Sequence, residues 1–94
     1  MRLTKDEINN IKNSVLTLDA SADVYLFGSR VDDSKRGGDI DLLITSTRLN
    51  EQNLRTIRRQ FFDRFGEQKM DLFLDAGDTN NAFINMIKPN AIKL

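Results

Sequence analysis

Apolar residues recur along this chain at two spacings, which predict its helices and its strands. Residues 8–16 place them three to four positions apart, behind the capping-box pattern of Thr4 and Glu7. Residues 50–65 repeat that spacing, and Gly66 follows where a helix commonly ends. Both segments are therefore predicted to be amphipathic helices that pack one face on a core.

Shorter apolar segments have the character of strands. Residues 24–27 are apolar throughout, as in a buried strand, whereas residues 39–45 and 69–74 mix aspartate with apolar positions. A short helix before Pro89 and a closing strand at 91–94 complete the pattern. The expected fold class is α/β (α+β), with a mixed sheet of about four strands and helices packed mainly on one face.

Composition narrows the class of protein. Ninety-four residues, 39% hydrophobic and 30% charged, fit one small globular domain spanning 1–94. A formal net charge of zero argues against a dedicated nucleic-acid binder, so direct contact with nucleic acid is not expected. No apolar run suits a membrane span and no signal peptide is recognisable, which predicts a cytoplasmic protein without a membrane partner.

Two residue types that carry much enzyme chemistry do not occur. The chain has no cysteine and no histidine. Disulfides, thiolate metal sites and a Ser-His-Asp triad within the chain are therefore excluded. Any general base must be a carboxylate, a lysine or water.

Two aspartates open the second predicted strand. Residues two apart in a strand point to the same face, so Asp39 and Asp41 direct both carboxylates to one place while Ile40 faces the core. Close carboxylates repel unless a cation lies between them, and Mg²⁺ prefers such oxygen ligands. The turn formed by Gly28 and Ser29 ends the preceding strand, and its N–H groups and hydroxyl can hold a phosphate.

Asp71 lies near the start of the third predicted strand, as Asp39 and Asp41 do in the second. If these strands are neighbours, three carboxylates converge as in a two-metal site, which stabilises both attacking and leaving oxygens. Phosphoryl-type transfer at such a site needs no histidine, because it depends on positioning and charge neutralisation. Either motif alone is more often a solvated turn than a site, and their combination favours nucleotide chemistry.

These motifs, in this order, resemble the signature of minimal nucleotidyltransferase (MNT) domains. That family belongs to the DNA polymerase β-like nucleotidyltransferase superfamily and carries G-S, a loop, D-x-D and a third aspartate on a later strand. The resemblance covers essentially the whole chain and leaves the substrate undetermined. The residues that carry it are Gly28, Ser29 and Arg30, then Asp39, Ile40, Asp41, Leu42, Leu43 and Ile44, and finally Gln68, Lys69, Met70, Asp71 and Leu72.

The resemblance implies a role for each candidate residue. Gly28 and Ser29 would hold the triphosphate of ATP. Asp39 and Asp41 would be ligands of two Mg²⁺ ions, and Asp71 would be the third catalytic carboxylate, which helps to activate the acceptor hydroxyl. Three basic residues of the loop would either contact phosphate or be solvated: Arg30, Lys35 and Arg36.

Stand-alone domains of this kind resemble the antitoxins of HEPN–MNT toxin–antitoxin systems. The resemblance implies an antitoxin that transfers AMP from ATP to a tyrosine hydroxyl of a HEPN-type ribonuclease toxin. The two proteins would form a hetero-oligomer. The small domain is expected to take its acceptor-binding surface from that partner.

Two alternatives stay open at this point. The chain could be a non-catalytic antitoxin that neutralises its partner by forming a complex. In support, Phe61, Phe62 and Phe65 cannot all face one narrow stripe, so one of them is expected at a partner surface. The chain could instead transfer a nucleotide to a small hydroxylated molecule, although no segment is left over to form a pocket for it.

Overall fold

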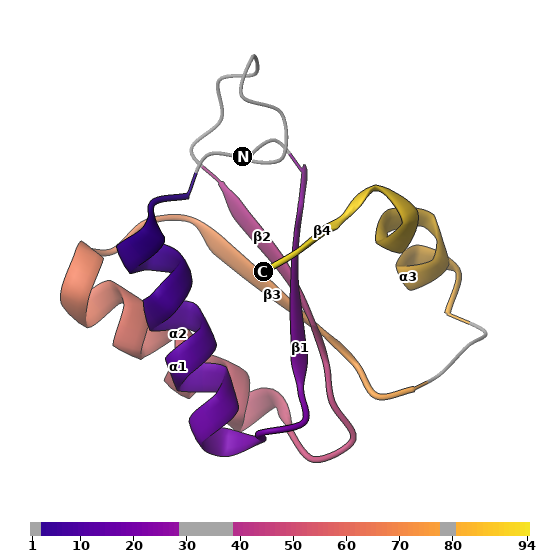
Figure 1. Cartoon of the computed structure of the whole chain (residues 1–94), viewed down its shortest axis with the longest axis horizontal. Helices are drawn as coiled ribbons and strands as arrows, with labels where there is room; N and C mark the ends of the chain where they lie inside the picture. The colour runs from indigo at the N-terminus through magenta and orange to yellow at the C-terminus, as the bar shows by residue number, and fades with distance from the viewer. Residues whose placement is uncertain (1–2, 29–38, 78–80) are drawn as a thin grey trace.

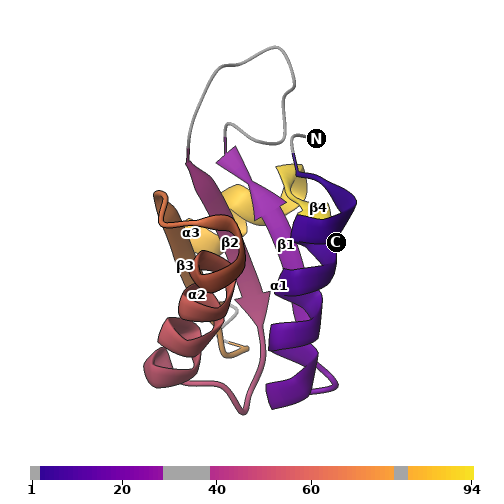
Figure 2. The same cartoon turned by 90° about the vertical axis from the view of Figure 1, so that its left-hand side faces the viewer.

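The computed structural model describes residues 3–28, 39–77 and 81–94 of the chain. Figure 1 and Figure 2 show the arrangement of the elements in two perpendicular views. The elements, in chain order, are α1 (Lys5–Leu18), β1 (Asp23–Phe27), β2 (Ile40–Thr45), α2 (Glu51–Phe65), β3 (Met70–Asp75), α3 (Ala82–Ile87), the 3-10 turn η2 (Lys88–Asn90) and β4 (Ile92–Lys93).

The strands form one mixed sheet in the order β3-β2-β1-β4. β1 runs antiparallel to both β2 and β4, whereas β2 and β3 run parallel. Parallel neighbours need a crossover connection, and α2 supplies it between β2 and β3. The predicted α+β fold class with a mixed sheet of about four strands is confirmed.

The helices cover the two faces of the sheet unequally. α1 and α2 lie side by side against one face, and the short α3 lies on the other (Figure 1, Figure 2). The main core lies under α1 and α2, as the prediction of helices mainly on one face requires. Its fully buried side chains include Ile11, Val15, Leu26, Ile40, Leu42, Ile44, Ile57 and Phe61.

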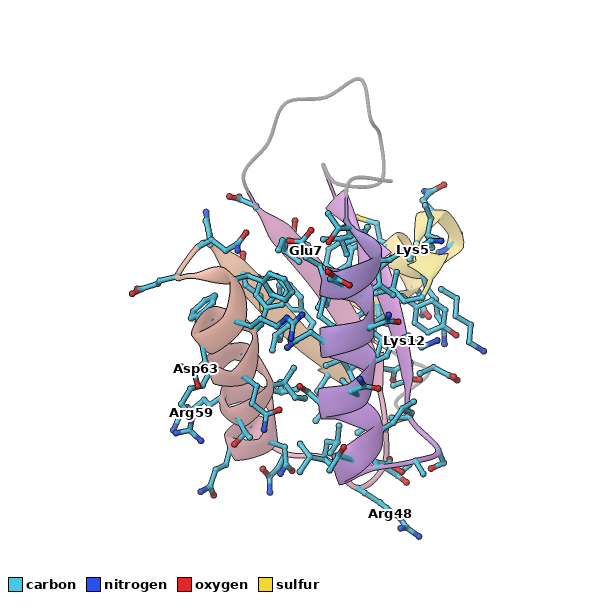
Figure 3. The ribbon with its side chains drawn as sticks, turned by 60° about the vertical axis from the view of Figure 1, so that its left-hand side comes forward. Lys5, Glu7, Lys12, Arg48, Arg59 and Asp63 are labelled. Carbon is cyan, nitrogen blue, oxygen red and sulfur yellow. The ribbon has the colours of Figure 1, made fainter. Side chains whose placement is uncertain are left out.

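The helix ends form as the sequence predicts. Thr4 and Glu7 make both hydrogen bonds of the capping box at the start of α1. Gly66 ends α2 with a φ of 88°, a conformation that favours glycine. Arg59 and Asp63 project outward from α2 into solvent (Figure 3). Within the part of the chain that the structure describes, no helix is long and apolar enough to cross a membrane.

The first predicted strand is buried on one face and half-buried on the other. In β1 only Val24 and Leu26 are buried, and Tyr25 and Phe27 on the other face are half-buried. The reason is the unequal cover of the sheet. The face of Tyr25 and Phe27 is covered by the short α3 and η2 rather than by two long helices.

The expected exposed phenylalanine is wrong. Phe61 is fully buried, and Phe62 and Phe65 pack against the core as half-buried side chains. The rings of Phe61 and Phe65 lie 4.8 Å apart, one helical turn from each other, so the apolar stripe of α2 is wide enough for all three. The exposed large apolar side chains of α3 are instead Phe83, 40% exposed, and Met86, 66% exposed.

Candidate functional site

Asp41 and Asp71 lie side by side where β2 and β3 begin. The two strands are parallel, and their register pairs Asp41 directly with Asp71. Since Ile40, Leu42, Met70 and Leu72 are buried under the long helices, the aspartates point to the opposite face. Both are half-buried there, and Asp71 lies close enough to raise the pKa of Asp41.

Asp39 comes two residues before Asp41, at the same edge of the sheet, and lies beside Lys69. The backbone N–H of Ile40 donates to the carbonyl oxygen of Lys69 at 3.0 Å, which brings the two preceding segments together. The Lys69 Nζ atom then lies 3.4 Å from Oδ2 of Asp39. The predicted aspartates are therefore gathered at one edge of the sheet, with a lysine that sequence reasoning missed.

Gly28 closes the site on the side of β1. The register pairs Phe27 with Asp41, so the chain leaves β1 next to that carboxylate. Gly28 has a φ of 79°, and a Cβ atom built on it would overlap Oδ2 of Asp41. Glycine is thus required here both by the backbone conformation and by the close approach of the carboxylate.

The electrostatics of the site centre on Asp41. Its pKa is raised above the ordinary value, first by burial, then by the negative charges of Asp71 and Asp39 and by the hydrogen bond with Asp71. The positive charge of Lys69 acts in the opposite direction. Ionisation of Asp41 is therefore less favourable than that of an ordinary aspartate, and a bound cation would promote it.

The donor set suits a divalent metal ion. Three carboxylates supply hard oxygen ligands. Because residue 28 is a glycine, no side chain at that position overlaps the Asp41 carboxylate. In the described ranges, no group of three acidic, histidine or cysteine side chains already has the arrangement of a metal site. Asp39 is paired with Lys69, and Asp41 lies beside Asp71 in register.

The remaining predicted site residues cannot be placed. Ser29, Arg30, Lys35 and Arg36 lie outside the described residues. Their roles in holding phosphate stay predictions, as does the metal-binding role of the three aspartates.

An aromatic cluster lies on the same face of the sheet as the carboxylates. Phe73 follows Asp71 by two positions in β3, and Phe27 pairs with Asp41 across β1 and β2. The rings of Phe27 and Phe73 are 5.6 Å apart, and Phe83 of α3 packs on Phe73 at 5.1 Å. Strand alternation places Phe73 with Asp71, but only the tertiary structure adds Phe83.

Comparisons with known proteins agree with this geometry at the level of the family. A search of curated proteins finds no relative that matches the chain. The family model described as a nucleotidyltransferase domain matches residues 8–90, which include β1, the carboxylates of β2 and β3, and α3. The chain therefore belongs to the nucleotidyltransferase domain family, whose members transfer nucleotidyl groups.

Proposed function

We propose that the protein is a cytoplasmic, Mg²⁺-dependent antitoxin that transfers AMP from ATP to a tyrosine hydroxyl of a HEPN-type ribonuclease toxin. Family membership supports the transfer of a nucleotidyl group. The observation that carries the proposal is the in-register pair of Asp41 and Asp71, with Gly28 against it. The choice of toxin and acceptor rests on the resemblance to HEPN–MNT systems.

In this proposal each residue of the site has its own role. Asp39 and Asp41 would hold two Mg²⁺ ions, and Asp71 would complete the second ion's ligands. Bound there, the ions would neutralise the phosphates and lower the pKa of an attacking hydroxyl. Gly28 and Ser29 would orient the triphosphate through backbone N–H groups.

The surface of α3 supports a protein as the acceptor. Phe83 and Met86 are exposed on the face of the sheet that also carries Asp41 and Asp71. Exposed apolar side chains beside a polar site are typical of surfaces that bind other proteins. A toxin that covered α3 would place its own surface next to the carboxylates.

A non-catalytic antitoxin is the second candidate, and the same exposed side chains favour it. Binding through Phe83 and Met86 would neutralise a partner without any transfer. The two candidates differ in whether the carboxylates are needed.

The deciding experiment measures the mass of the HEPN toxin after co-expression with this protein. The Asp41→Ala variant is compared with wild type, and Asp63→Ala, an exposed aspartate on α2, is the matched control. A gain of whole AMP units with wild type and Asp63→Ala, lost with Asp41→Ala, supports the transferase. An unmodified toxin that still co-purifies supports the binding antitoxin. If the toxin is neither modified nor co-purified, the acceptor should be sought among small hydroxylated molecules.

A further inference from the structure

We propose that Lys69 is a built-in counter-ion of the carboxylate site, which competes with divalent metal for Asp39 and thereby weakens metal binding. The inference rests on the proposed metal-dependent function. It gives a role to Lys69, which lies in the segment that carries the resemblance but has no role there, and it assigns the direction of its effect.

The first support is the position of Lys69. Ile40 and Met70 form the first register pair of β2 and β3, so the residues just before them also face each other. The hydrogen bond from the Ile40 N–H to the Lys69 carbonyl holds them there. Lys69 and Asp39 thus form one row, next to the row of Asp41 and Asp71.

The second support is charge. The carboxylates of Asp39, Asp41 and Asp71 gather at one edge of the sheet. Among the described residues, Lys69 is the only cation found within ion-pair distance of any of them, at 3.4 Å from Asp39. A metal ion bound by Asp39 would meet this ammonium group, so it must displace the ion pair and then tolerate a nearby like charge.

The third support is freedom of movement. The Lys69 side chain is 68% exposed and that of Asp39 is 42% exposed. Such an ion pair is weak and the lysine stem is flexible, so the ammonium can be displaced. Lys69 should therefore lower the metal affinity without preventing binding.

The chain offers a matched control in Lys93. Its Nζ atom lies 3.3 Å from Oδ1 of Asp23, and the two side chains are 60% and 44% exposed. This ion pair has nearly the same length and exposure, but it joins β4 to β1, on the far side of β1 from β2 and β3. Loss of Lys93 removes one positive charge from the protein and leaves the carboxylate site unchanged.

The test is titration with Mn²⁺ alone, followed through the relaxation rate of water protons, on the full chain. The Lys69→Gln variant should bind Mn²⁺ about two- to fivefold more tightly than wild type, the factor expected for an exposed ion pair. Lys69→Arg, which keeps the charge, and Lys93→Gln should bind like wild type. Thermal unfolding of each variant verifies that it is folded.

Each other outcome contradicts the inference. If Lys69→Gln binds Mn²⁺ equally or more weakly while wild type binds it, Lys69 does not compete, and the proposed function stands. If Lys93→Gln gains as much as Lys69→Gln, the effect is one of net charge. If wild type binds no Mn²⁺ at millimolar concentration, both the inference and the metal-dependent function fail.

Discussion

A side chain on Gly28 would overlap the carboxylate of Asp41. The two residues come from adjacent strands, and the overlap is with Oδ2, the oxygen that faces the end of β1. Gly28 thus leaves room for the Asp41 carboxylate, as well as adopting the positive φ of the turn. This relationship links the glycine of the G-S motif to the second aspartate of D-x-D.

Gly28→Ala should therefore weaken metal binding as well as destabilise the fold through backbone strain. We expect it to lower the free energy of unfolding by at least about 1 kcal/mol, because alanine is disfavoured at positive φ. It should also weaken Mn²⁺ binding by displacing Asp41. Urea unfolding and Mn²⁺ titration measure the two effects.

Gly66→Ala is the control for that variant. Gly66 has a similar φ of 88° and nothing within 4 Å of the added atom. It should lose stability from strain alone and bind Mn²⁺ as wild type does. Equal Mn²⁺ binding by both variants would show that the overlap with Asp41 has no consequence.

Asp41→Asn should stabilise the free protein at neutral pH. The folded-state pKa of Asp41 is raised, mainly by burial and by the charge of Asp71, so the folded protein holds its proton over a pH range in which the unfolded chain has already lost it. Well below the ordinary pKa near 3.8 the group is neutral in both states and costs no stability. The difference in melting temperature between the variant and wild type should therefore grow as the pH rises from the ordinary pKa to the raised folded-state pKa, and stay constant above it.

With Mg²⁺ added, wild type should become more stable than Asp41→Asn. Wild type should gain stability from a ligand that binds only the folded state, and Asp41→Asn should gain less. Melting temperatures measured with and without millimolar Mg²⁺ test this. A gain of the same size in both proteins would mean that Asp41 is not a ligand.

Transfer activity should depend on the carboxylates as a group. Asp41→Ala and Asp71→Ala should each lower the rate of AMP transfer by roughly 100- to 1000-fold, since bound metal supplies several kcal/mol to the transition state. Labelled ATP, Mg²⁺ and the toxin form the assay. Asp63→Ala should keep wild-type activity, and activity retained by Asp41→Ala would overturn the proposed mechanism.

Under the proposed function, binding of the toxin should depend on α3. Met86→Lys should weaken the complex without lowering the melting temperature, because Met86 is 66% exposed. Leu16→Lys, at an exposed apolar position on α1, is the control, and α1 lies on the opposite face of the sheet from α3. Co-purification or titration calorimetry would compare them. Equal loss of binding in both variants would point away from α3 as the docking surface.

Ser46→Ala should destabilise the fold and leave the site intact. Ser46 Oγ donates to Asp19 at 2.5 Å, and it accepts from the N–H groups of Arg48 and Leu49. These bonds join the end of α1 to the loop before α2, at the opposite end of β2 from Asp41. Loss of a buried hydrogen-bond partner should lower the melting temperature by roughly 4–8 °C for each kcal/mol lost. Thr47→Ala, at an exposed neighbour, should have little effect.

The same cluster predicts an acid effect. Hydrogen bonds from Ser46 and then Ser21 lower the pKa of Asp19 in the folded state. The stability they contribute is present above the ordinary pKa near 3.8 and is lost as the pH falls through the lowered folded-state value. Ser46→Ala should therefore reduce the loss of stability that wild type shows in acid.

The order of helices and strands, and most of their ends, could be predicted from local patterns. The capping box of Thr4, the end of the helix at Gly66 and the placement of Asp71 and Phe73 on one strand face are properties of neighbouring residues. Their physical cause is the geometry of one helical turn or one strand, which the local sequence contains. The three aspartates could therefore be chosen as candidates without coordinates.

Only the tertiary structure decided which of these residues meet. The parallel pairing of β2 with β3 brings Asp41 beside Asp71 and Lys69 beside Asp39, and α3 comes to cover the face opposite the long helices. The predicted exposure of one phenylalanine near residue 61 failed for the same reason. Pairing and burial depend on the free energy of packing segments distant in the chain, and no local spacing specifies that energy.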